Sequence, residues 1–357
     1  MQKIRVFLLC FVAFAFSIAA EVSIGQRLVD YFCPDEFSDL HISDWNNPSL
    51  DDYLEIEHYL RERQERVKNN LFAEKFILPN KLDGLISYRI GRTKITDGTE
   101  PRFVKIDFGD NPDQREYCII SYAGCDFGDR NYENGLITIA RALERVGFKG
   151  HLLYRVGGWP SLQKGRLRFA DVPYAFKPFM FEEVRDMGYK HILWLDACCI
   201  PIRNLTPIFK HIEKHGYCYF SEGEMPHHFI ETWDFVRDAL NMPKRDVYSN
   251  VITQIVGVSS NHPTGSSLLN QWIDAACSKL PFLSPTGDQF CFSLLIDKNN
   301  LKEGRLPNSI RLNTSVTDFS FIHSKYKAFF LHDYIVVDTK FQPSEAFFNK
   351  LPLRRRR

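Results

Sequence analysis

The alternation of apolar and polar residues changes character near Tyr117. Before that point one period is clear: after Ser49, which can cap a helix, apolar residues recur at intervals of three, four or seven. The residues of this stripe are Tyr53, Ile56, Leu60, Val67 and Leu71. We therefore expect residues 21–115 to form a partly helical N-terminal extension.

From Tyr117 onward, short apolar runs alternate with helical stripes, which predicts strands alternating with helices. The expected strands are 118–123, 151–155, 191–195, 217–221, 253–259 and 329–337. The expected helices are 136–146, 176–187, 206–215, 229–240 and 269–280, and a further one begins near Asp288. This order is typical of a doubly wound α/β domain, in which a mostly parallel sheet has helices on both faces; we place it at residues 116–345.

The two ends of the chain have distinct compositions. Lys3 and Arg5 precede an apolar run from Val6 to Ala20, and the polar Glu21 follows, which is typical of a secretory signal. The run is short for a membrane-spanning helix, so we expect residues 1–20 to be a cleaved signal. The alternative is an uncleaved signal anchor, which would then be the one segment that contacts a membrane. The protein would be secreted or lumenal (endoplasmic reticulum or Golgi) in a eukaryote and exported in a bacterium. Residues 346–357 end in four arginines and are typical of a solvated tail.

Charge and composition limit the kind of partner. The 45 basic and 44 acidic residues give a formal net charge of +1, so the chain has no large positive field with which to hold a nucleic acid polymer. The chain is 44% hydrophobic and 25% charged, as ordinary globular proteins are, which excludes collagen, coiled coil and general disorder.

Cysteines and sequons bear on the compartment. Of the nine cysteines, Cys10 lies in the expected signal, and the even number that remains permits disulfides without specifying their pairing. Two sequons begin at Asn204 and Asn313, which a eukaryotic secretory route would glycosylate. Asn204 also stands just before a predicted helix, where its side chain can serve the turn.

Asp196 is the first candidate for chemistry. It directly follows the most strongly apolar run, His191 to Leu195, and therefore ends a predicted strand at the sheet edge where ligands bind in this fold class. A carboxylate there is desolvated on one side, which is unfavourable unless a positive group meets it. A divalent cation, or Lys177 in the preceding helix, would supply that charge.

The stretch from Tyr174 to Pro201 resembles GT-A-type glycosyltransferases, the nucleotide-diphospho-sugar transferase superfamily. It combines a helix carrying Lys177, an apolar strand and Asp196-Ala197-Cys198, in the place where that superfamily has a DxD motif for the metal and the donor diphosphate. The resemblance implies a GT-A-like, Rossmann-like fold, Asp196 and Lys177 as donor-binding residues, and Mn²⁺ or Mg²⁺ as cofactor. Cys198 replaces the second acid, and a neutral thiol is a poor ligand for these hard ions, which puts two-carboxylate metal binding in doubt.

Further positions fit the same resemblance. The strand-end residues that it implies as donor contacts are Ser121, Tyr122 and Ala123. Asp288, which opens a helix, is implied together with Asp196 as a catalytic residue, either accepting the proton of the acceptor hydroxyl or hydrogen-bonding it. His332 matches a late metal ligand of several related families.

Each of these residues has a plainer interpretation that the sequence leaves open. Asp196 and Asp288 are also the kind of residue that caps a turn or a helix. Lys177 could be an ordinary solvated lysine, His332 a half-buried strand histidine, and Cys198 a small buried filler.

The favoured function is transfer of a hexose from a nucleotide-diphosphate sugar to a hydroxyl of a glycan, glycoprotein or glycolipid. One alternative is a secreted binding protein of the same fold that has lost turnover and binds a nucleotide sugar or a glycan, which the missing second acid favours. Another is a haloacid-dehalogenase-like phosphatase, in which an apolar strand also ends in Asp, although Cys198 departs from that pattern as well. The donor, the acceptor and the stereochemical outcome are left open.

Overall fold

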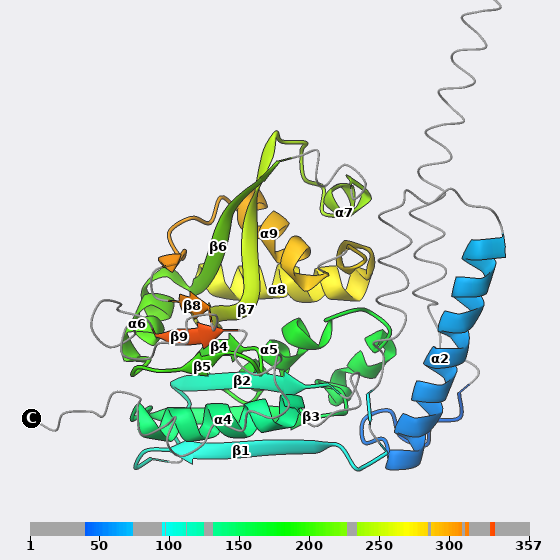
Figure 1. Ribbon diagram of the computed structural model, residues 1–357, viewed down its shortest axis with the longest axis horizontal. Coiled ribbons are helices and arrows are strands. Elements are labelled where there is room, and N and C mark those ends of the chain that lie inside the picture. The colour runs from blue at the N-terminus through cyan, green and yellow to red at the C-terminus, as the bar shows by residue number, and fades with distance from the viewer. Residues whose placement is uncertain are drawn as a thin grey trace, which may run out of the picture.

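The centre of the molecule is a six-stranded sheet (Figure 1). The computed structural model describes residues 40–73, 95–96, 98–111, 113–124, 131–226, 234–284, 287–308, 311–313 and 329–332. Across the sheet the strand order is β1-β3-β2-β4-β7-β6. The strands are β1 (Arg102–Phe108), β2 (Tyr117–Ala123), β3 (Gly150–Val156), β4 (His191–Leu195), β6 (Tyr217–Pro226) and β7 (Val247–Ser259).

The strand directions place a switch in the chain path between β2 and β4. β2 pairs in parallel with both β3 and β4, whereas β7 pairs antiparallel with β4 and with β6. β3, β2, β4 and β6 therefore run in one direction, and β1 and β7 run in the other. The path goes from β2 to β3 on one side and then returns to β4 on the other side of β2. The carboxyl ends of β2 and β4 are where this class of fold binds its ligands.

Helices cover both faces of the sheet, as the sequence predicts. One face carries the apolar cluster of α4 (Asn131–Arg145) and α6 (Thr206–His215), and the other carries that of α5 (Phe176–Asp186), α8 (Pro263–Ser278) and α9 (Asp288–Lys298). Alternate residues of β4 belong to different clusters: Leu193 and Leu195 pack on the α6 side, and Ile192 and Trp194 pack on the α5 side. The expected α/β architecture is confirmed.

The helix predicted after Ser49 is α2 (Leu50–Ala73), which stands at one side of the sheet in Figure 1. The Ser49 hydroxyl oxygen accepts from the backbone N–H of Asp52 at 3.2 Å, and the Asp52 carboxylate accepts from the backbone N–H of Ser49 at 2.8 Å. These reciprocal bonds satisfy donors that a helix start leaves open. Tyr53, Ile56 and Leu60 are buried in the α5-side cluster, so α2 packs on the main domain.

Several elements differ from the prediction. β1 lies in the stretch assigned to the extension, yet it pairs antiparallel with β3 as an edge strand of the main sheet. A small second sheet joins β5, β9 and β8. The remaining bounds are β5 (Ile200–Pro201), β8 (Arg311–Asn313), β9 (Phe330–His332), α7 (Asp234–Ala239) and short 3-10 turns at Leu162–Lys164, Arg166–Phe169 and Leu280–Phe282.

Some predictions fall outside the described residues. These are the N-terminal signal, the basic tail, and the parts of the expected elements at 229–233 and 333–337. Within the described residues, none of the helices combines the length and the apolar character needed to cross a bilayer.

Candidate functional site

Three charged side chains meet beyond the carboxyl end of β4. Lys177 extends from the first turn of α5, Asp196 follows β4, and Asp288 is the first residue of α9. The Lys177 ammonium nitrogen lies 3.1 Å from Asp196 Oδ1 and 2.9 Å from Asp288 Oδ2. The sequence singled out each of these residues, and the fold brings them together from positions 19 and 92 residues apart along the chain.

Lys177 has no N–H donor left for another partner. Besides the two carboxylates, its ammonium group donates to the backbone oxygen of Thr253 on β7 at 3.1 Å, and an ammonium has three N–H donors. The Lys177 and Asp288 side chains are 5% and 3% exposed, whereas that of Asp196 is 27% exposed. Asp196 is therefore the member of this cluster, the Lys177 cluster, that can meet a ligand.

The electrostatics of the Lys177 cluster follow from this burial. Burial on its own lowers the pKa of a lysine, but the carboxylates of Asp196 and Asp288 outweigh it and raise the pKa of Lys177 above its ordinary value. Burial raises the pKa of Asp196, although Lys177 and the indole of Trp194 counteract part of that rise. Two carboxylates around one ammonium leave one negative charge in excess, so the cluster favours a further cation or a hydrogen-bond donor.

The side chain of Asp196 does not cap the turn after its strand. The turn is closed by backbone groups, since the Cys199 N–H donates to the Asp196 carbonyl oxygen at 2.8 Å. The carboxylate instead accepts at Oδ1 from Trp194 Nε1 at 2.5 Å and from Lys177. Its other oxygen, Oδ2, has no hydrogen-bond or ion-pair partner among the residues that the structure describes.

The three residues predicted as donor contacts lie at the end of β2, the strand that pairs with β4. Ser121 is fully buried and donates to the backbone oxygen of Leu195, which ties β2 to β4 next to Asp196. The ring of Tyr122 stacks on Phe176 with centroids 4.4 Å apart, and its hydroxyl donates to the Gly158 carbonyl. Ala123 is 2% exposed. A donor contact from this strand stays a prediction, since these side chains pack inside the domain.

The residues present do not fit a metal held by two carboxylates. Cys198 is buried in the apolar cluster of α4 and α6, on the sheet face opposite Lys177 and Asp288. α4 packs directly against this turn at Gly135, where an added Cβ would clash with the carbonyl oxygen of Ala197. His332 lies in β9, and its side chain is outside the described part of the chain. In the Lys177 cluster, the oxygen that is best placed for an ion is therefore Oδ2 of Asp196, which belongs to the more exposed of the two carboxylates.

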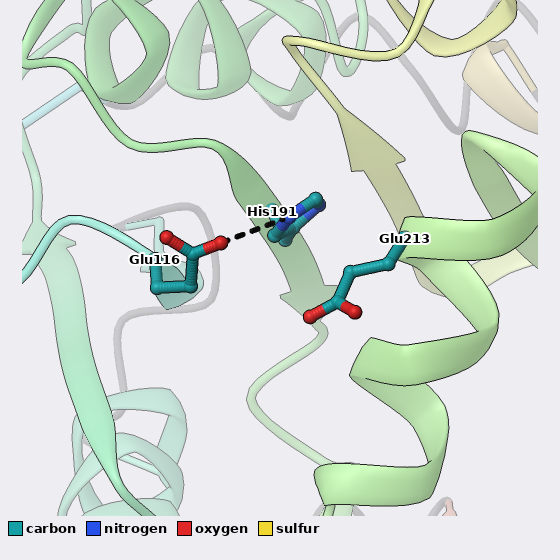
Figure 2. Close-up of side chains that lie close together, drawn as sticks. All are labelled: Glu116, His191 and Glu213. Atoms are coloured by element: carbon teal, nitrogen blue, oxygen red, sulfur yellow. Dashed lines mark ion pairs between the residues drawn. The ribbon is translucent and has the colours of Figure 1, made fainter.

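A second charged cluster lies at the opposite, amino edge of the sheet (Figure 2). Glu116 before β2, His191 at the start of β4 and Glu213 of α6 place one potential ligand atom each within 4.8 Å of one another. Each carboxylate already has an ammonium partner, since Lys190 lies 2.9 Å from Glu116 and Lys210 lies 2.7 Å from Glu213. We interpret this group as a charge-balanced network that fastens α6 to the sheet.

Sequence reasoning missed two residues of the Lys177 cluster. Thr253 of β7 donates its hydroxyl to Asp288 Oδ2 at 2.5 Å and accepts from Lys177 through its backbone oxygen. The sequence predicts Trp194 only as a strand residue, yet its indole N–H donates to Asp196. The spacing of Trp194 and Asp196 carried a signal, because residues i and i+2 of a strand point to the same face.

Asn204 and the cysteines also have definite places. The Asn204 amide nitrogen donates to the carbonyl oxygens of Val146 and Gly147, and its oxygen accepts from the Thr206 N–H, so the side chain serves the turn before α6. No disulfide joins any two of five described cysteines, which are Cys118, Cys198, Cys218, Cys277 and Cys291.

No family model and no curated protein matches the chain. Among solved structures it is similar to a glycosyltransferase involved in glycosylation of the major capsid of PBCV-1, at 10% identity and a TM-score of 0.34, over 66% of this chain and 98% of that one. It is also similar to mouse xyloside xylosyltransferase 1, at 12% identity and a TM-score of 0.36, over 61% of this chain and 97% of that one. A third likeness, to the galactosyltransferase LgtC in complex with donor and acceptor sugar analogs, has 12% identity and a TM-score of 0.34 over 66% and 94%. Likenesses at these identities and TM-scores carry no functional argument, so the function proposed below rests on the geometry of the Lys177 cluster.

Proposed function

We propose that the protein is a glycosyltransferase that moves a hexose from a nucleotide-diphosphate sugar to a hydroxyl of a glycan, glycoprotein or glycolipid. The observation that carries the proposal is the Lys177 cluster itself. In this cluster the partly exposed carboxylate of Asp196 pairs with the buried ammonium of Lys177 beyond the carboxyl end of β4. β2 and β4 meet there, at the switch in the chain path where α/β sheets bind nucleotides.

Asp196 is the ligand-facing residue of this proposal. Its Oδ2, which has no partner within the described part of the chain, can accept a hydrogen bond from a hydroxyl of the donor or contact a cation that the donor brings. Burial of the neighbouring groups strengthens such a contact, because the surrounding medium screens charge less than water does. Loss of this carboxylate should therefore weaken donor binding more than loss of an exposed carboxylate elsewhere.

Lys177 and Asp288 act inside the site. Lys177 donates to Asp196, Asp288 and the Thr253 carbonyl oxygen, and so fixes the positions of both carboxylates. Asp288 is 2% exposed and pairs with Lys177, so in this structure it holds the ammonium in place from inside the site. We keep its role as a base for the acceptor hydroxyl as a prediction to be tested by substitution.

A divalent cation fits the Lys177 cluster in a limited way. The excess negative charge and the free Asp196 Oδ2 suit Mn²⁺ or Mg²⁺ held by one protein oxygen, since these ions prefer oxygen ligands. The ion would neutralise charge on the donor diphosphate. His332, the other metal ligand implied by the resemblance, stays a proposal.

One observation favours the alternative of a binding protein without turnover. The position of the second motif acid is taken by Cys198, which is buried on the far face of the sheet, so the residue is part of the core and not of the site. Such a protein would bind a nucleotide sugar and release no nucleoside diphosphate.

The test separates these functions in two steps. The purified protein is heated with UDP-glucose, UDP-galactose, UDP-N-acetylglucosamine or GDP-mannose, with and without Mn²⁺, because a ligand that binds only the folded state raises the melting temperature. Release of nucleoside diphosphate is then measured for each donor that stabilises the protein. Stabilisation with release supports the transferase, stabilisation without release supports the binding protein, and no stabilisation by any donor contradicts both.

The compartment is part of the proposal. We place the folded domain on the far side of one membrane, secreted or lumenal, because of the charge and apolar order of residues 1–20. The sequon at Asn204 is then expected to stay unmodified, since its amide nitrogen is bound to two carbonyl oxygens.

A further inference from the structure

Trp194 contacts both members of the ion pair at the ligand-facing carboxylate. Its indole N–H donates to Asp196 Oδ1 at 2.5 Å, and the Lys177 ammonium nitrogen lies 5.3 Å from the centre of its ring. A cation over an indole face is attracted by the negative face of the ring. The Trp194 side chain therefore contacts the Asp196 carboxylate through its N–H edge and the Lys177 ammonium through its ring face.

The ring has little freedom to move. Trp194 is 1% exposed, is part of the α5-side apolar cluster, and has the Phe176 ring 6.0 Å away between centroids. As a strand residue two positions before Asp196, it points to the same face of the sheet. The direction of its N–H is thus fixed by the core of the domain before any ligand arrives.

The N–H of Trp194 has an acceptor, in contrast to the N–H groups of two other buried tryptophans. Trp159 and Trp272 are also buried, and within the described residues their indole nitrogens have no hydrogen-bond partner. Packing alone thus accounts for those two rings. For Trp194, packing leaves unexplained why the N–H meets the one partly exposed carboxylate of the Lys177 cluster.

We propose that Trp194 is a positioning residue, whose indole N–H and ring hold Asp196 so that Oδ1 is bound inside the protein and Oδ2 alone faces the ligand. The proposal rests on the proposed function for the identity of that ligand. Trp194 would thus orient the single carboxylate of a motif in which Cys198 stands in place of the second acid. A carboxylate that cannot rotate presents its oxygen at no further entropic cost when the donor binds.

The kinetic experiment compares two matched substitutions. Trp194→Phe and Trp272→Phe make the same chemical change at two buried positions, but only the first removes an N–H that has an acceptor. With the donor that stabilises the wild type in the four-sugar panel, we expect Trp194→Phe to raise the donor KM by about tenfold or more, the effect of losing a hydrogen bond to a charged group. Trp272→Phe should change the donor KM by less than about twofold. Equal donor KM values for the two variants would overturn the proposal.

A measurement without ligand keeps the proposal testable if a variant folds poorly or no donor binds. The chain has five tryptophans, and the indole signal that disappears from the ¹⁵N spectrum of Trp194→Phe identifies the Trp194 N–H. If that variant does not fold, the signal is identified by specific ¹⁵N labelling at position 194 of the wild type. In Asp196→Ala this signal should move upfield because its acceptor is gone, while the other indole signals stay in place. An unchanged Trp194 signal in Asp196→Ala would overturn the proposal. If the signal shifts but no donor binds, the result would support the hydrogen bond between Trp194 and Asp196 and would contradict the proposed function.

Discussion

Lys177 is the residue on which the site's charge balance depends. Its side chain is 5% exposed, and it is bound to Asp196, Asp288 and the Thr253 carbonyl. The sequence indicated that a positive group must meet Asp196 and named Lys177 as one choice. It could not indicate Thr253, because that residue reaches the cluster through a strand pairing and its backbone oxygen, which leave no pattern in side-chain spacing.

Replacing Lys177 should destabilise the protein strongly. Lys177→Met leaves two carboxylates without their ammonium partner, and removing one partner of a buried ion pair costs about 3–5 kcal/mol. The free energy of unfolding, measured by urea denaturation, reports the loss. Lys190→Met is the matched control, because Lys190 pairs with Glu116 at the surface, where such a pair contributes about 1 kcal/mol or less. Equal losses in the two variants would show that the Lys177 pairs are no stronger than surface pairs.

Restoring the motif acid should not restore a two-carboxylate metal site. Cys198→Asp would place a carboxylate in the apolar cluster of α4 and α6, on the far face of the sheet from Lys177 and Asp288. We expect a lower melting temperature than for Cys198→Ser, and no additional stabilisation by Mn²⁺. A gain in Mn²⁺-dependent stability in Cys198→Asp would contradict this placement of Cys198.

At the scale of elements, the strands and helices after Tyr117 were predictable because each buries a regular stripe or run. β1 was not predicted, although Val104, Ile106 and Phe108 alternate with charged residues, because the alternation is short and its burial is incomplete. The close fit of α4 to the turn after β4 was also beyond the sequence, since it depends on backbone approach at Gly135 and not on a side-chain pattern.

That fit gives a prediction for α4. In Gly135→Ala the new Cβ meets the Ala197 carbonyl oxygen, so α4 or the turn carrying Asp196 must shift. We expect a loss of about 1–3 kcal/mol, the usual effect of overpacking, together with a smaller rise in melting temperature on adding the donor. Ile137→Ala, on the exposed side of the same helix, should leave the donor-induced rise unchanged. A donor response in Gly135→Ala as large as in the wild type would refute this link between α4 and the site.

At the scale of the whole molecule, the sheet has two charged edges with different properties. The carboxyl edge holds the Lys177 cluster, with one excess negative charge, and the amino edge holds Glu116, His191 and Glu213 with two lysine partners. Only the first has a charge left for a ligand to satisfy. We therefore assign the proposed function to the carboxyl edge and expect the amino edge to contribute to stability.

The amino edge should make stability fall on mild acidification. Burial lowers the pKa of His191 below its ordinary 6.5, although Glu213 and Glu116 counteract part of this, and burial also lowers the pKa of His211. Below about pH 6.5 the unfolded chain binds protons that the folded chain does not, so the free energy of unfolding decreases as pH falls from that value towards the folded pKa. Urea denaturation at pH 7 and pH 5.5 measures the decrease.

Two variants assign that decrease. His191→Gln should reduce the difference in unfolding free energy between the two pH values, because the buried group that resists protonation is gone. His41→Gln, at an exposed position, should retain the wild-type difference. If His191→Gln loses as much unfolding free energy between pH 7 and pH 5.5 as the wild type does, His191 does not contribute to the decrease.

The most direct test of the account measures donor affinity by calorimetry in the wild type, Asp196→Asn and Asp113→Asn. Asp113 is an exposed carboxylate in the loop before β2, away from the Lys177 cluster. The account predicts that Asp196→Asn raises the Kd of the stabilising nucleotide sugar by about tenfold or more, as expected for the loss of a charged hydrogen-bond acceptor. Asp113→Asn should leave the Kd within about twofold of the wild-type value. A nucleotide sugar that binds Asp196→Asn as tightly as it binds the wild type would contradict the claim that the carboxylate beyond β4 faces the donor.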